Sequence, residues 1–148
     1  MPVQPDWASP TRKRRRSNET GRSTVSGSTC LRPAVEALAR RASIPVAVCG
    51  EAPERLPDQV ELAAYFVVSE ALTNVAKHAS ARAAAVSLDQ ESGVLRVTVT
   101  DNGVGGAQIT AGSGLAGLRD RLDALDATLA IESEPGAGTT IRAELSCE

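Results

Sequence analysis

Three polar residues lie on one side of the helix that we predict over residues 58–79. At about 100° per residue, Glu70 and Asn74 are one turn apart at the edge of an apolar stripe, and Lys77 shares their side. The stripe consists of Val60, Ala64, Val67, Ala71 and Val75. Polar side chains at the edge of a buried stripe can line a cleft. The alternative is a solvated Glu–Lys face that carries a single Asn.

Asp101 ends a run of alternating apolar residues. The two-residue period of a strand directs its carboxylate to the same side as Leu95, Val97 and Val99, which is the side expected to be buried. A buried carboxylate requires hydrogen-bond donors. The alternative is that Asp101 only turns the chain, because Asp-Asn-Gly is a common turn sequence.

Glycines follow Asp101 and precede a predicted helix. Gly103, Gly105 and Gly106 form the first group, and Gly112 and Gly114 form the second. Glycines before a helix let backbone N–H groups approach an anion at the positive end of the helix dipole. The segment GSGLAG matches G-x-G-x-x-G but follows a long loop rather than a strand, so it does not predict a dinucleotide site. No G-K-[ST] sequence is present, which excludes a Walker A motif.

The elements that position these residues can be predicted from periodicity and turn residues. Asp58 is a candidate N-cap for the long helix, and the turn 91–93 joins two strands. The predicted helices are 31–43, 58–79 and 115–125, and the predicted strands are 44–48, 84–90, 94–101, 128–134 and 139–145. This order predicts an α+β fold, a two-layer sandwich in which three helices cover one face of a mixed five-stranded sheet.

Four sequence blocks, taken together, resemble a known family. They are EALTNVAKHA, DNGVGG, GSGLAGLRDR and PGAGTT, which look like the N-box, two glycine boxes and the final G-x-G-T element. Their order and spacing resemble the GHKL ATPase superfamily. The resemblance is greatest to the catalytic ATP-binding domain of sensor histidine kinases of the nitrate-sensor class, and it covers about residues 31–146.

The resemblance implies ATP and Mg²⁺ as ligands. Asn74 would bind a magnesium ion that bridges the phosphates, and Asp101 would accept a hydrogen bond from the adenine amino group. Thr139 would lie near Asp101, and its alternation with Ile141 also directs it inward. The loop 104–114 would be an ATP lid, with Gly112 and Gly114 at the phosphates. The remaining nucleotide-binding candidates in these blocks are Lys77, His78, Gly103, Gly105 and Leu115.

These roles suit the chemistry of the side chains. Mg²⁺ prefers oxygen ligands and keeps several waters, so one amide oxygen is a reasonable share. A carboxylate can accept from the adenine amine but repels a carbonyl, which favours adenine over guanine. Glu70, one turn before Asn74, is a candidate general base.

The phosphoacceptor is the point at which the chain departs from the family. The only histidine, His78, lies inside the N-box, and we expect it to be a packed or phosphate-side residue rather than the acceptor. Residues 1–30 are too short and too polar for a dimerisation hairpin. The resemblance implies a histidine-bearing dimerisation domain and a response regulator as partners. The alternatives are an anti-sigma-type serine kinase and a non-catalytic ATP-dependent switch.

Composition and charge set further limits on the 148-residue chain. Residues 1–30 carry six basic and two acidic side chains, whereas the whole chain has a net charge of −2. Their few apolar groups predict a disordered segment, with the folded domain at 31–148. The basic run 11–16 lacks interleaved aromatic residues, so we expect a solvated tail rather than a nucleic-acid site. The absence of a long apolar run and of paired cysteines predicts a cytoplasmic protein with no membrane span.

Overall fold

The computed structural model describes residues 31–51, 55–106 and 114–147. The predicted disordered segment 1–30 and most of the predicted lid, residues 107–113 with Gly112, lie outside the described residues. The elements are α1 (Leu31–Arg41), β1 (Val46–Cys49), α2 (Asp58–Asn74), η2 (Val75–Ala79), β2 (Ala84–Glu91), β3 (Val94–Asp101), α3 (Gly114–Asp123), β4 (Thr128–Glu132) and β5 (Thr139–Ser146).

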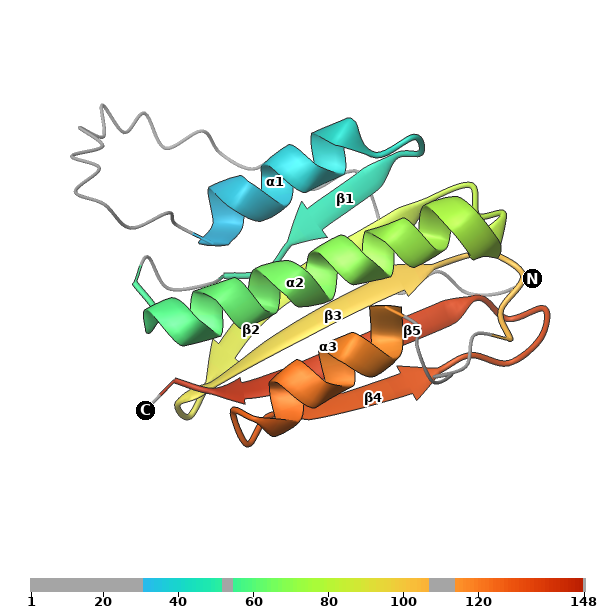
Figure 1. Cartoon of the computed structure of the whole chain (residues 1–148). Coiled ribbons are helices and arrows are strands. Elements are labelled where there is room, and N and C mark those ends of the chain that lie inside the picture. Colours follow the sequence, from blue (N-terminus) through green and yellow to red (C-terminus); the bar gives the residue numbers. More distant parts are fainter. Residues whose placement is uncertain (1–30, 52–54, 107–113, 148) are drawn as a thin grey trace, which may run out of the picture.

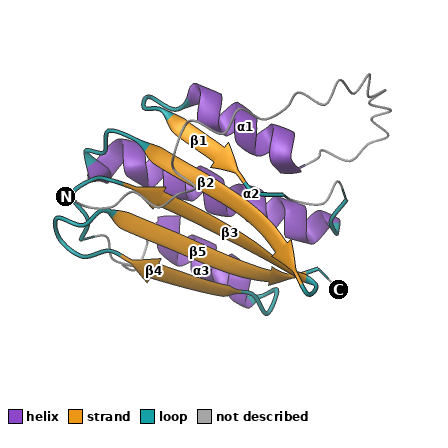
Figure 2. Ribbon diagram, turned by 180° about the vertical axis from the view of Figure 1, so that it is seen from behind, coloured by secondary structure: helices purple, strands orange, loops and turns teal. Residues whose placement is uncertain are grey.

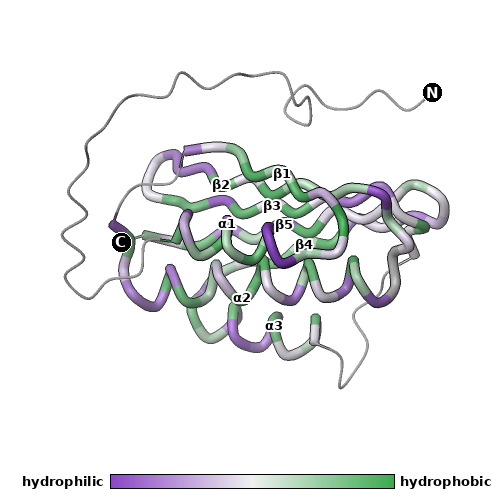
Figure 3. Tube along the Cα trace, turned by 90° about the horizontal axis from the view of Figure 1, so that it is seen from above, coloured by the Kyte–Doolittle hydropathy of each residue, from purple (hydrophilic) through white to green (hydrophobic). Residues whose placement is uncertain are grey.

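The five strands form one mixed sheet in the order β1-β2-β3-β5-β4. β1 pairs with β2 in parallel, and every other pair is antiparallel. All three α-helices lie on the same face of the sheet (Figures 1 and 2). Figure 3 shows the sheet and the helices as two separate layers. The predicted two-layer α+β architecture is confirmed.

The core lies between the two layers and is built mainly from aliphatic residues. All five members of the predicted stripe on the long helix are buried. The strand alternation is also confirmed, because Leu95, Val97 and Val99 are almost completely buried on β3. Apolar burial of this kind is the main favourable term that holds the helix layer on the sheet.

The long helix begins differently from the prediction. Pro57 occupies the N-cap position, and no side chain makes a capping hydrogen bond there. The Pro57 carbonyl instead accepts from the backbone N–H groups of Val60 and Glu61 at 2.9 and 3.0 Å. Asp58 is therefore the first helical residue and not the N-cap. Its carboxylate still lies at the positive end of the helix dipole, where a negative charge is favourable.

The same helix ends in a π-helical turn. Residues 75–79 form η2, and Ser80 terminates it in the left-handed region with φ 47°. A π-helix has i→i+5 hydrogen bonds and therefore more residues per turn than an α-helix, so each residue turns the chain by less than about 100°. The 100° steps used in the sequence analysis place Val75 correctly but do not give the directions of the side chains after it. No described helix is long and apolar enough to cross a bilayer.

Candidate functional site

The motif residues, spread from residue 70 to residue 139, gather at one end of the sandwich. The strand register places Asp101 in one row with Ala84 and Thr139. Residues 80–83 link η2 to Ala84, so the long helix ends at the same end of the sheet. Figure 1 shows the last turns of this helix, the end of β3 and the start of β5 together there.

Asp101 is buried at this end of β3, with an exposed fraction of 7%. Its Oδ1 accepts from the backbone N–H of Gly103 at 2.8 Å, and the backbone N–H of Thr139 donates to the same carboxylate. Both interpretations from the sequence therefore hold in part. The side chain faces the buried side of the sheet, and it also stabilises the turn that follows the strand.

Burial raises the pKa of Asp101 above its ordinary value of 3.8, and the hydrogen bonds from Gly103 and Thr139 offset this only in part. The folded chain therefore keeps this proton to a higher pH than the unfolded chain does. Because the unfolded state binds fewer protons in this range, the free energy of unfolding falls as the pH rises.

We expect this effect in the pH dependence of stability. Between pH 3.8 and the raised pKa, the wild type should lose free energy of unfolding relative to Asp101→Asn, which cannot titrate. Urea unfolding of both proteins across this range measures the difference. A wild type that gains stability over Asp101→Asn as the pH rises would contradict the predicted direction.

Thr139 is the second buried polar residue of the described part, with an exposed fraction of 8%. Its hydroxyl lies 2.6 Å from the Ser133 hydroxyl across the β4–β5 turn. Ser133 is a polar neighbour that the sequence analysis missed. Its place just after the alternating run of β4 is a signal that could have indicated it.

The first glycine box is hydrogen-bonded to the turn between β4 and β5. The Gly136 N–H donates to the Val104 carbonyl at 2.6 Å. Gly105 and Gly138 have φ of +68° and +74°, and a side chain on either would collide with a backbone carbonyl of the opposite segment. Glycine is required at both positions by conformation and by space. The start of the predicted lid is therefore held by backbone contacts next to Asp101.

Asn102 also holds this end of the sheet together. Its side-chain oxygen accepts from the backbone N–H groups of Arg82 and Ala83 at 2.8 and 3.0 Å. These residues lie between η2 and β2, so the Asn102 side chain links that connection to the end of β3. The sequence analysis placed this Asn in the Asp-Asn-Gly turn and in the first glycine box but gave it no role of its own.

Glu70 and Asn74 are both half-buried on α2. The Glu70 carboxylate lies against Gly114, the first residue of α3, where its Oε2 occupies the space that a side chain would need. The structure thus brings together two predicted site residues, one from the N-box and one from the second glycine box.

The other predicted residues differ in how the structure places them. Gly103 contacts Asp101 as described above. Lys77 is exposed in η2, and the side chain of His78 is outside the described part of the structure, as is Gly112. Leu115 is 4% exposed in the core, so only its backbone is available to a ligand.

The side chains at this site fit a magnesium ion that has few protein ligands better than a metal ion whose ligands all come from the protein. Among the described residues, no group of three or more His, Cys, Asp or Glu is placed to hold a metal ion. Asn74 offers one neutral oxygen with the Glu70 carboxylate one turn away. Mg²⁺ commonly takes few protein ligands and completes its shell with water and phosphate oxygens.

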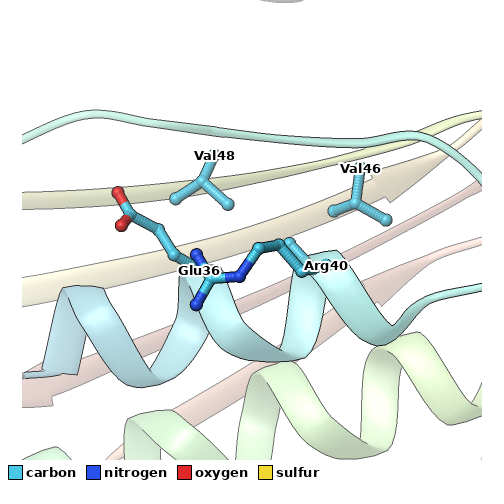
Figure 4. Close-up of a pocket in the computed structure, with 5 residues that line it drawn as sticks. Glu36, Arg40, Val46 and Val48 are labelled. Carbon is cyan, nitrogen blue, oxygen red and sulfur yellow. The ribbon is translucent and has the colours of Figure 1, made fainter.

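A separate open groove of about 300 Å³ lies between α1 and β1 (Figure 4). Its lining consists of Glu36, Ala39, Arg40, Val46 and Val48. It contains none of the residues from the four sequence blocks.

Comparison with known proteins identifies the family. Residues 59–148 match the model for histidine kinase-, DNA gyrase B- and HSP90-like ATPases. The chain is 40% identical over 91 residues to the signal transduction histidine-protein kinase/phosphatase DegS of Brevibacillus brevis, covering 60% of this chain and 24% of DegS. It is 30% identical over 131 residues to the sensor histidine kinase YxjM of Bacillus subtilis, covering 86% of this chain and 32% of YxjM. The chain thus spans a third or less of the length of these two relatives.

Solved structures agree with the sequence relatives. The histidine kinase domain of the Erythrobacter litoralis EL346 blue-light activated histidine kinase superposes with a TM-score of 0.61 at 28% identity, covering 79% of this chain and 59% of that domain. The catalytic domain of the histidine kinase ThkA shares the fold, with a TM-score of 0.61 at 13% identity, over 80% of this chain and 94% of that domain. The resemblance inferred from the four sequence blocks is therefore confirmed. This chain belongs to the family of histidine kinase-, DNA gyrase B- and HSP90-like ATPases, and its relatives include sensor histidine kinases.

Proposed function

We propose that the chain is the ATP-binding catalytic domain of a two-component sensor histidine kinase. It transfers the γ-phosphoryl group of ATP to a histidine supplied by another domain or chain. The observation that carries this proposal is the position of Asp101. Its carboxylate is buried and held by two backbone donors at the end of the sheet where the N-box helix also ends.

Each residue has a distinct role in this proposal. Asp101 accepts from the adenine amino group, and Thr139 lines the same pocket beside it. Asn74 contributes an oxygen to Mg²⁺, which neutralises charge on the phosphates when bound. Glu70 is the general base that takes the proton from the attacking group. Lys77, His78, Gly103, Gly105, Gly112, Gly114 and the backbone of Leu115 complete the proposed nucleotide site.

The proposed function also implies two partners. A histidine-bearing dimerisation domain supplies the acceptor, and a response regulator takes the phosphoryl group from it. A cytoplasmic location follows from this role, because ATP and response regulators are found there. The serine-kinase alternative has less support, because the relatives described above are histidine kinases.

We expect the full chain and a fragment starting at Leu31 to bind Mg-ATP with the same affinity. Leu31 is buried at the start of α1, and the preceding residues have too few apolar groups to add to a core. Isothermal titration calorimetry measures both. The full chain failing to bind Mg-ATP would overturn the proposed function, whereas failure of the shorter fragment alone would overturn the boundary at residue 31.

A further inference from the structure

The contact between Glu70 and Gly114 joins the N-box helix to the start of α3. A Cβ at position 114 would have three atoms of the Glu70 carboxylate, Oε2, the carboxyl carbon and Oε1, as its nearest neighbours. The Glu70 side chain therefore fills the volume beside the first turn of α3. A carboxylate in that place is favoured by the N-terminal end of the helix dipole.

Backbone conformation does not explain the glycine at position 114. Six described glycines have positive φ, and Gly114 is not among them. An alanine is compatible with its helical backbone, and the surface there is exposed. What an alanine would displace is the Glu70 carboxylate. Gly117, on the same helix, provides the contrast, because a Cβ there would meet nothing within 4 Å.

We propose that Gly114 is a positioning residue, whose missing side chain lets the Glu70 carboxylate lie against the first turn of α3 and so sets its direction. This inference rests on the proposed function for the role of Glu70. It adds that the second glycine box acts on the general base as well as on the nucleotide.

The first test is a double-mutant cycle on the rate of phosphoryl transfer. At saturating Mg-ATP, Gly114→Ala should lower the transfer rate about tenfold or more, because small misplacements of a reacting group are costly. In the Glu70→Gln background, Gly114→Ala should cause no further loss. As a control that does not depend on activity, Gly117→Ala should shift the unfolding midpoint equally in the wild type and in the Glu70→Ala background, since nothing meets its added methyl group. Losses that multiply in the double variant would overturn the inference.

The second test needs no activity and separates the contact from the proposed function. Gly114→Ala should raise the unfolding midpoint more in the Glu70→Ala background than in wild type, because only the wild type must move a carboxylate aside. Differential scanning calorimetry of the four proteins measures this. Equal shifts in both backgrounds would overturn the inference. If this cycle shows the coupling but the wild type transfers no phosphoryl group, the proposed function is wrong and the contact between Glu70 and Gly114 still stands.

Discussion

Asp101→Asn is expected to weaken Mg-ATP binding by about 5- to 150-fold, which corresponds to roughly 1–3 kcal/mol. The two carboxylate oxygens of Asp101 accept from the N–H groups of Gly103 and Thr139, and in the proposed complex also from the adenine amine. An asparagine has one acceptor oxygen and an NH₂ group. At least one of the three donors would then face another donor in a buried place.

Calorimetry with ATP and GTP measures this loss. Asp89→Asn is the matched control, because it also removes a carboxylate charge. Asp89 is exposed and lies near the end of β2 that is far from Ala84, the partner of Asp101. The control should bind ATP as the wild type does, and GTP should bind the wild type much more weakly than ATP. Unchanged ATP affinity in Asp101→Asn, or equal affinity of the wild type for ATP and GTP, would remove Asp101 from the base pocket.

Periodicity was sufficient to predict the layers and the burial of Asp101. The two-residue alternation of β3 continues without a bulge to its last residue, so the face assigned to Val99 also applies to Asp101. The stripe on the long helix was equally regular. Such patterns report directly on the boundary between core and solvent, because burial of apolar area decides which face turns inward.

Contacts between distant segments could not be predicted in this way. The pairing of Gly136 with Val104 and the packing of Glu70 on Gly114 depend on the turn and helix geometry of both partners. The π turn at residues 75–79 has no periodic signal either. Single π turns are rare, and they are frequently found at functional sites.

Glu70→Gln is expected to produce the largest effect, a loss of about 10²- to 10⁴-fold in the rate of phosphoryl transfer. The amide keeps the size of the side chain but cannot accept a proton from the attacking group. Mg-ATP affinity should change much less than the rate. A histidine-bearing dimerisation domain can be supplied as the acceptor, with radiolabelled ATP and the purified chain.

The matched control is Glu61→Gln, a carboxylate in the first turn of the same helix and therefore distant from the site. It should transfer label at the wild-type rate.

The chain alone should bind ATP without labelling itself, because transfer requires a nucleophile positioned in line with the γ-phosphate. Label on the acceptor should be acid-labile, as phosphohistidine is, whereas acid-stable label would favour the serine-kinase alternative. Acid-labile label on the chain alone that is lost in His78→Ala would show that His78 is the acceptor. A Glu70→Gln variant that transfers at the wild-type rate would show that Glu70 is not the base.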